Sequence, residues 1–322
     1  SGTEANDAAL MLATTARRSN QILAMRNSYH GRSFTTIAIT AQRSWSPTSV
    51  SGMSVNYVHG GYRLRSPFRH LDDEDYTAAC VDDLTQVFDM MTSGDVAAMI
   101  AEPIQGVGGF ATPPDGFFGA MKKELENRGV LFISDEVQTG FGRTGTNFWG
   151  FENHGLKPDI VTMAKGINNG AVPMGAAIVR KEIYDTFMDE MPTGVEFFHG
   201  YTYSGHPLAA AAGCATLDVY QGEGLFEKAR AMEDTFADAL YSLKDEPNVI
   251  DVRGIGLIGA VELEGIEGQP TARALNIFRE CFDNGVIIRT TGDTLAFSPP
   301  LMISQDEIGT VVDAVRSALR NN

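Results

Sequence analysis

Short apolar runs alternate along the first two thirds of the chain with longer stretches in which apolar residues recur at helical spacing. Strands that alternate with helices are typical of a largely parallel β-sheet covered by helices on both faces. The pattern predicts a helix at the start of the chain and further helices over residues 116–128 and 207–221. The predicted strands occupy residues 21–25, 96–101, 130–134, 159–164 and 175–179.

The pattern changes after residue 222. Helices are predicted near 225–244, 270–284 and 304–320, with strands near 249–253, 256–263 and 286–298. We therefore predict an α/β fold with a large, mostly parallel-sheet α/β/α domain over 1–222 and a smaller C-terminal α+β domain over 223–322. Residues 41–80, which are rich in Ser, Pro, Arg and His, are predicted to form a long surface excursion.

Composition narrows the class of protein. The 322 residues are 43% apolar, which allows a sizeable core and excludes a mainly disordered chain. Asp and Glu outnumber Lys and Arg by 41 to 25, and the net charge of −16 argues against a nucleic-acid partner. We interpret this charge as a solvated surface, with a salt-rich habitat as the alternative. Three unclustered cysteines exclude a disulfide scaffold and indicate a reducing, cytoplasmic location. Neither a signal peptide nor a membrane-spanning run is found.

The start of the chain is unusual. There is no initiator Met, and Ser1 and Glu4 are the residue types found at the beginning of a helix. Because a strand or loop normally precedes such a helix, we expect the sequence to begin in the middle of a fold.

Polar residues follow the predicted strands where each strand ends. Glu102, Asp135 and Lys165 stand at these positions, and ligands of open α/β sheets bind at the carboxyl ends of the strands. Lys165 is the one lysine of seven that follows an apolar strand, and small residues flank it. Partial desolvation there would lower the pKa of its amine and favour amine chemistry.

A buried Asp135 needs a cationic or hydrogen-bonding partner. A protonated ring nitrogen would serve, because a lysine Schiff base with an aspartate–pyridinium pair is the signature of a pyridoxal phosphate site. The helix start at Gly2 and Thr3 could bind the phosphate, and Tyr29 could stack on the ring.

Two other motifs are rejected. Residues 140–145 and 254–259 both match the pattern G-x-G-x-x-G, but no helix is predicted after either, as a dinucleotide site requires. The six histidines show no metal-ligand spacing, so no metal site is expected.

Several stretches, taken in order, resemble one family. They lie at residues 1–6, 29–31, 102–106, 133–145, 159–166 and 202–207. Through nearly its whole length the chain resembles the class III, omega-type pyridoxal-phosphate-dependent aminotransferases of fold type I. Relatives in this family are longer before the position of Ser1, where they supply part of the small domain and of the substrate pocket.

The resemblance implies catalytic roles for Lys165 and Asp135. Lys165 would link covalently to pyridoxal 5'-phosphate and then move a proton, while Asp135 would pair with the ring nitrogen. Val137 and Tyr29 would contact opposite faces of the ring, and Gln138 would lie near its hydroxyl. The reaction would be a ping-pong transfer of an amino group from an amine to a keto acid.

The resemblance also implies further cofactor-binding residues. Gly2 and Thr3 would hold the phosphate, and Thr202 would reach the phosphate of the neighbouring subunit of a homodimer. Glu102 would lie near Asp135, and His30 beside the stacking tyrosine; a structural role is an equal alternative for these two.

Two departures bear on the substrate. Family members that act on ornithine or 4-aminobutyrate carry an arginine where Ala296 stands, and a gating glutamate where Val107 stands. Their joint loss favours an amine or omega-amino-acid donor with pyruvate or glyoxylate as acceptor, and leaves open whether Arg289 binds a carboxylate. The alternatives are another enzyme of the same fold, such as a mutase, decarboxylase, racemase or phospho-lyase, or a truncated and poorly active cofactor-binding member.

Overall fold

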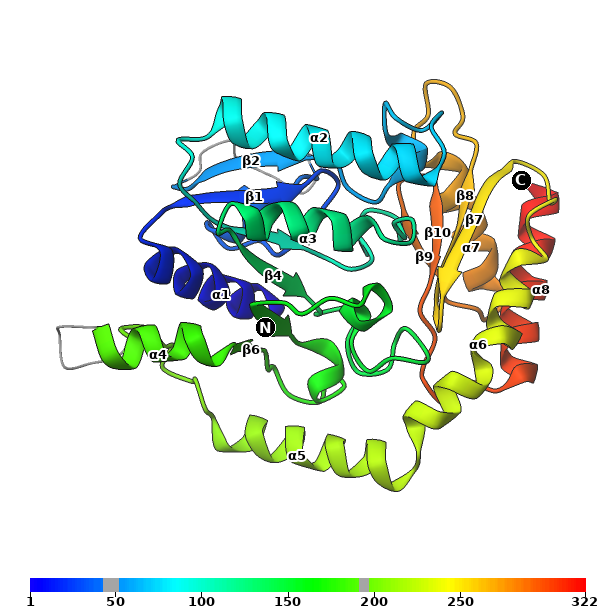
Figure 1. Ribbon diagram of the computed structural model, residues 1–322. Helices are drawn as coiled ribbons and strands as arrows, with labels where there is room; N and C mark the ends of the chain where they lie inside the picture. The colour runs from blue at the N-terminus through cyan, green and yellow to red at the C-terminus, as the bar shows by residue number, and fades with distance from the viewer. Residues whose placement is uncertain (43–51, 191–196) are drawn as a thin grey trace.

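The computed structural model describes residues 1–42, 52–190 and 197–322 (Figure 1). Its larger sheet has six strands in the order β2-β1-β3-β4-β5-β6. All neighbouring strands are parallel except β6, which pairs with β5 in the antiparallel sense. The strands are β1 (Gln21–Met25), β2 (Ser54–Val58), β3 (Val96–Ala101), β4 (Leu131–Asp135), β5 (Ile160–Met163) and β6 (Ala176–Val179).

Helices cover both faces of this sheet because successive strand residues point to opposite sides. Ile22 and Ala24 of β1 pack in one cluster with α1 (Gly2–Arg17) and α4 (Lys181–Glu190). Leu23 and Met25 pack in another with α2 (Asp73–Met91) and α3 (Phe117–Asn127). The apolar area buried on both faces is the main source of stability for such a layer.

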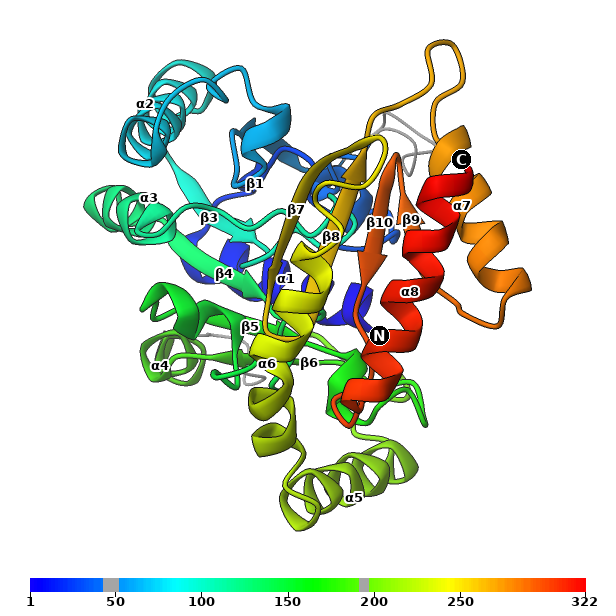
Figure 2. The ribbon, with the colours of Figure 1, turned by 90° about the vertical axis from the view of Figure 1, so that its right-hand side faces the viewer.

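The second sheet is antiparallel, with strand order β7-β8-β10-β9. Its outer face is covered by three helices, and its inner face turns toward the larger sheet (Figure 2). On this inner face Ile258, Ala260 and Ala296 pack on Ile104 and Phe110, so the turn after β3 lies between the two sheets. The elements are α6 (Leu225–Tyr241), β7 (Val249–Ile255), β8 (Ile258–Leu263), α7 (Ala272–Asp283), β9 (Arg289–Thr291), β10 (Thr294–Phe297) and α8 (Gln305–Asn321).

The helix α5 (Pro207–Gly222) joins the part of the chain that builds the larger sheet to the part that builds the smaller one (Figure 1). It exposes Leu208, Leu217 and Val219, an apolar surface that the rest of the described chain leaves uncovered. Among the described residues, every helix is too short or too polar to cross a membrane. Short 3₁₀ helices lie at Thr36–Ile39, Arg63–Arg65, Gly150–His154 and Lys165–Ile167.

The predicted fold class is confirmed, but two predictions of detail were wrong and two helices were missed. Residues 41–80 are not one surface excursion, because β2 and the first part of α2 lie within them; residues 43–51 of that segment lie outside the described residues. The helices α2 and α4 were missed. The strand predicted over 286–298 is two strands, β9 and β10, that turn at Gly292 with φ 59°. The division into domains at residue 222 stays a prediction.

Candidate active site

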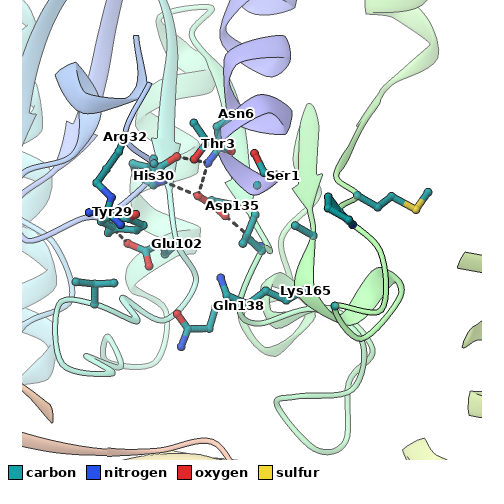
Figure 3. Close-up of a pocket in the computed structure, with 18 of the residues that line it drawn as sticks. Ser1, Thr3, Asn6, Tyr29, His30, Arg32, Glu102, Asp135, Gln138 and Lys165 are labelled. Carbon is teal, nitrogen blue, oxygen red and sulfur yellow. Dashed lines mark hydrogen bonds and ion pairs between the residues drawn. The ribbon is translucent and has the colours of Figure 1, made fainter. Parts of the chain in front are cut away.

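The carboxyl ends of β3, β4 and β5 meet the amino end of α1 around one cavity (Figure 3). Its volume is about 530 Å³, within the range of small-molecule sites. Every predicted site residue except Thr202 lines it: Gly2, Thr3, Tyr29, His30, Glu102, Asp135, Val137, Gln138 and Lys165.

The amino end of α1 forms one wall. The Ser1 side chain accepts a hydrogen bond from the Glu4 amide while Glu4 reaches back to the amino terminus, so a reciprocal cap fixes the first turn. A side chain on Gly2 would place its Cβ 2.8 Å from Val137, so only glycine fits there. The unpaired N–H groups of a first turn attract an anion, and they face the cavity.

Asp135 is the centre of a buried hydrogen-bond network. Its Oδ2 accepts from Asn6 Nδ2 at 2.8 Å and lies 2.7 Å from His30 Nδ1, and its Oδ1 accepts from the Val137 amide at 3.0 Å (Figure 3). Burial alone would raise the pKa of this carboxyl, but His30 and the other two donors hold the pKa below its ordinary value. Asp135 is therefore kept as an anion facing the cavity.

Asn6 was not among the predicted site residues. Its amide donates to both Asp135 and the His30 carbonyl, and its oxygen accepts from Thr162 Oγ1 at 2.6 Å. Asn6 therefore orients Asp135 and His30, two site residues that were predicted from the sequence. A signal existed, because Asn6 is a polar residue one turn after Thr3 on the buried face of the first helix.

Glu102 is buried at the end of β3, where its two oxygens accept from the amides of Tyr29 and Gly106, both at 2.9 Å. Burial, together with the neighbouring charge of Asp135, raises the pKa of Glu102 to about 7, while His30 opposes the rise. The carboxylate thus holds two loops of the cavity wall and can carry a proton near neutral pH.

This raised pKa predicts a pH-dependent contribution to stability. The folded protein keeps a proton on Glu102 up to about pH 7, whereas the unfolded chain releases it near pH 4.5. The stabilisation is complete below pH 4.5 and is lost as pH rises through 7. The side chain of Glu102→Gln does not titrate. The free energy of unfolding of this variant, relative to that of the parent, should therefore rise by about 2–3 kcal/mol between pH 5 and pH 8.

Urea unfolding of the cofactor-free protein at the two pH values measures this difference. The control is Glu74→Gln on the exposed side of α2. Between the two pH values its free energy of unfolding should change as much as that of the parent. A stability gap between Glu102→Gln and the parent that is equal at both pH values would contradict the assignment.

Lys165 faces Asp135 and Glu102 across the cavity (Figure 3). Desolvation by the surrounding protein lowers the pKa of its amine and Arg289 adds to the effect, while the two carboxylates oppose it. The backbone is also unusual, because Lys165 has a φ of 39°, a value that side-chain-bearing residues rarely adopt. An activated amine in a constrained backbone is a common arrangement for a nucleophile.

The turn after β3 forms the wall opposite the amino end of α1. Val107 lines the cavity, and its carbonyl accepts from Thr291 Oγ1 at 2.6 Å. Arg289, two residues earlier on β9, also lines the cavity and is the cross-strand partner of Ala296. The sequence could not show that β9 reaches this cavity, because the packing of the second sheet on the turn brings it there.

The remaining predictions concern Thr202, the two glycine motifs and metal binding. Thr202 lies exposed outside its own chain's cavity, so its role toward a neighbouring subunit stays a prediction. The first rejected glycine motif, residues 140–145, lies in an irregular turn, and the second, residues 254–259, forms the hairpin between β7 and β8; neither is directly followed by a helix, as predicted. Among the described residues, no three His, Cys, Asp or Glu side chains are grouped to hold a metal ion.

Comparison with known proteins identifies the family to which the chain belongs. The profile of the family described as aminotransferase class-III matches residues 1–319. The omega-aminotransferase of Caulobacter vibrioides is 39% identical over 99% of this chain and 74% of its own length. The beta-alanine–pyruvate aminotransferase of Pseudomonas aeruginosa is 40% identical over 74% of this chain and 53% of its own.

Solved structures agree with the sequence comparison. An (S)-enantioselective omega-transaminase from Thermomicrobium roseum has a TM-score of 0.91 at 34% identity, covering 100% of this chain and 73% of that one. The expected fold type I aminotransferase architecture is thereby confirmed. The chain belongs to the class-III aminotransferases, the omega-transaminase family, whose members use pyridoxal phosphate to move amino groups between amines and keto acids.

Proposed function

We propose that this chain binds pyridoxal phosphate in the cavity and transfers an amino group from an amine or omega-amino acid to pyruvate or glyoxylate. The observation that carries the proposal is the placement of Lys165 opposite the anionic Asp135 at the amino end of α1. The three features match the aldehyde, ring nitrogen and phosphate of the cofactor. When bound, the cofactor supplies an aldehyde for the amino group and a ring that withdraws electrons from the substrate carbon.

The residues fit this group. Asp135 Oδ2 already contacts Asn6 and His30, but Oδ1 accepts only from the Val137 amide and keeps a second lone pair for a ring N–H. The first turn of α1 offers free amides to a phosphate, and the absence of a side chain at Gly2 keeps that turn close to Val137. Gly31 (φ 131°) allows its backbone to approach Thr3, whose Oγ1 would lie 2.6 Å from a Cβ there.

Lys165 has two tasks in this proposal. The lowered pKa of its amine favours the unprotonated form, which is the form that would attack the cofactor aldehyde. Once free, Nζ would hold the proton taken from the amine-bearing carbon of the substrate and would pass that proton to the bound cofactor. Asn6 and His30 keep Asp135 oriented and charged while this occurs.

The choice of substrate rests on the wall formed by the turn and β9. Val107 and Ala296 are uncharged and buried, so neither binds a carboxylate. Arg289 lines the cavity and is also exposed to solvent. A guanidinium can form two parallel hydrogen bonds with a carboxylate. A small keto acid, which carries one carboxylate, would suit a contact with Arg289. The name of the Pseudomonas aeruginosa relative, which specifies pyruvate, supports the same acceptor.

We further propose a homodimer with Thr202 contacting the phosphate of the neighbouring subunit. Large apolar side chains lie exposed close to Thr202, with Phe198, Tyr203 and Leu208 at 80%, 78% and 61% exposure. Several large apolar side chains exposed within one short segment are typical of a subunit interface.

The test is a spectrum followed by a substrate screen. The purified chain is loaded with pyridoxal phosphate, its visible absorption band is recorded, and amine donors are assayed with pyruvate, glyoxylate and 2-oxoglutarate. We expect the band, together with faster turnover of pyruvate or glyoxylate. Absence of the band would overturn cofactor binding, and turnover with 2-oxoglutarate alone would overturn the proposed acceptor.

Arg289→Ala is expected to weaken keto-acid binding specifically. Loss of a charge-assisted pair should raise the KM for pyruvate by roughly 10- to 100-fold. The KM for a donor without a carboxylate, such as benzylamine, should stay nearly constant. Steady-state kinetics with both substrates measure the split, and Arg279→Ala on the surface of α7 is the control. Equal increases for both substrates would contradict a carboxylate contact.

A further inference from the structure

The backbone that carries Lys165 is constrained on its far side, away from the cavity. Lys165 and the next two residues form a single 3₁₀ turn. Lys165 itself has a φ of 39°, in a backbone region that residues with side chains rarely adopt. Such a conformation persists only where the surroundings hold it in place.

The hydroxyl of Tyr220 supplies a direct restraint. Tyr220 lies near the end of α5, only 7% exposed, and its hydroxyl donates to the Gly166 carbonyl at 2.7 Å. The Gly166 carbonyl belongs to the peptide between Gly166 and Ile167, so this hydrogen bond fixes a peptide plane within the turn that begins at Lys165. Without it, that carbonyl has no partner among the described residues, because the short turn ends one residue later.

A second contact holds the same peptide from another side. The Phe141 side chain packs on Gly166 so closely that a Cβ there would lie 2.8 Å from it. Phe141 also stacks on Tyr220, with ring centroids 6.2 Å apart and an interplanar angle of 29°. Tyr220 therefore orients the lysine turn through its hydroxyl and, through its ring, supports the side chain that packs on the turn.

We propose that Tyr220 is a positioning residue for Lys165, holding the strained turn so that the amine faces the cavity. The inference rests on the proposed function of Lys165 as the residue that links to the cofactor. Tyr220 does not line the cavity, so it acts through the backbone of Gly166 and touches neither cofactor nor substrate. A turn released from this restraint would let the amine turn away from its productive direction.

The experiment compares Tyr220→Phe with Tyr76→Phe. Tyr76 is an apt control because it is equally enclosed and its hydroxyl also donates to a glycine carbonyl, that of Gly60, at 2.6 Å. Each variant loses one hydroxyl and its hydrogen bond to a glycine carbonyl, but only the bond of Tyr220 lies in the turn that begins at Lys165. Circular dichroism confirms that both are folded.

Two measurements follow. Pyridoxal phosphate is added to each cofactor-free protein, and growth of the visible band is followed by stopped flow. Tyr220→Phe should slow this growth roughly 10-fold, because attack depends on orientation of the amine, while Tyr76→Phe should match the parent. In the loaded enzymes, Tyr220→Phe should lower kcat with donor KM within about twofold of the parent.

The outcomes separate the two proposals. Equal band growth in Tyr220→Phe and the parent would overturn the positioning role while leaving the proposed function intact. Equal slowing in both variants would overturn it as well, since the effect would then follow general destabilisation. A parent protein that forms no band would overturn the proposed function and this inference together.

Discussion

Lys165→Ala is expected to abolish amino transfer, with kcat falling by at least roughly 10⁴-fold, the upper range for loss of a general acid–base group. The loss should be this large because the same amine would link to the cofactor and move the substrate proton. The other lysines that the structure describes lie outside the cavity, so none can take over either task. The visible absorption band of the loaded protein should disappear as well.

Kinetics and absorbance spectra of the loaded variants measure both effects. Lys157→Ala, an exposed loop lysine before β5, is the matched control and should behave as the parent does. If Lys165→Ala kept the parent's band, the covalent linkage would have to be assigned to another residue.

Asp135→Asn should produce the second-largest loss. The substitution keeps the size of the side chain and removes the charge that the network of Asn6 and His30 maintains. Losing one partner of a buried ion pair costs about 3–5 kcal/mol, and a loss of that size in the transition state lowers kcat by roughly 2 × 10²- to 5 × 10³-fold. Cofactor affinity should fall too, because the ring nitrogen would face a neutral amide.

The adjacent residue provides a sharp control for this substitution. Glu136 is equally buried, but it does not line the cavity and instead accepts from Thr139 and from the amides of Gly150 and Phe151. Glu136→Gln should therefore reduce stability by about 1–3 kcal/mol with little change in kcat. Similar losses of kcat in both variants would show that the charge of Asp135 has no special task.

The catalytic half of the site could be predicted because it is local to strand ends. A polar residue directly after a buried strand lies at the sheet edge whatever the rest of the chain does, so Glu102, Asp135 and Lys165 were found together. Asn6 and Arg289 were not placed, because their positions depend on helix orientation and on the packing of a second sheet. Such contacts join segments far apart in sequence and leave no periodic trace in it.

The missed details have similarly physical reasons. Lys122 stands in a run of charged residues typical of an exposed helix face, yet it is buried and pairs with Asp159 at 3.2 Å. The charged residues beside Lys122 in the sequence make its position look exposed. Its burial depends instead on which face of the helix packs against the sheet. The helix α2 was missed because its acidic first turn continues the polar composition of the preceding segment.

The turn after β3 couples the residues that would have to change together for substrate preference to evolve. It is bound to Glu102 through Gly106, to β9 through Thr291, and to β7 through Arg253, which donates to the Gly109 carbonyl. Val107 and Thr291 therefore belong to one hydrogen-bonded unit, and the effects of substitutions at the two positions on specificity should not add. Variants that reshape this wall one residue at a time would miss combinations that work only as pairs, so paired libraries are the efficient route to new donors.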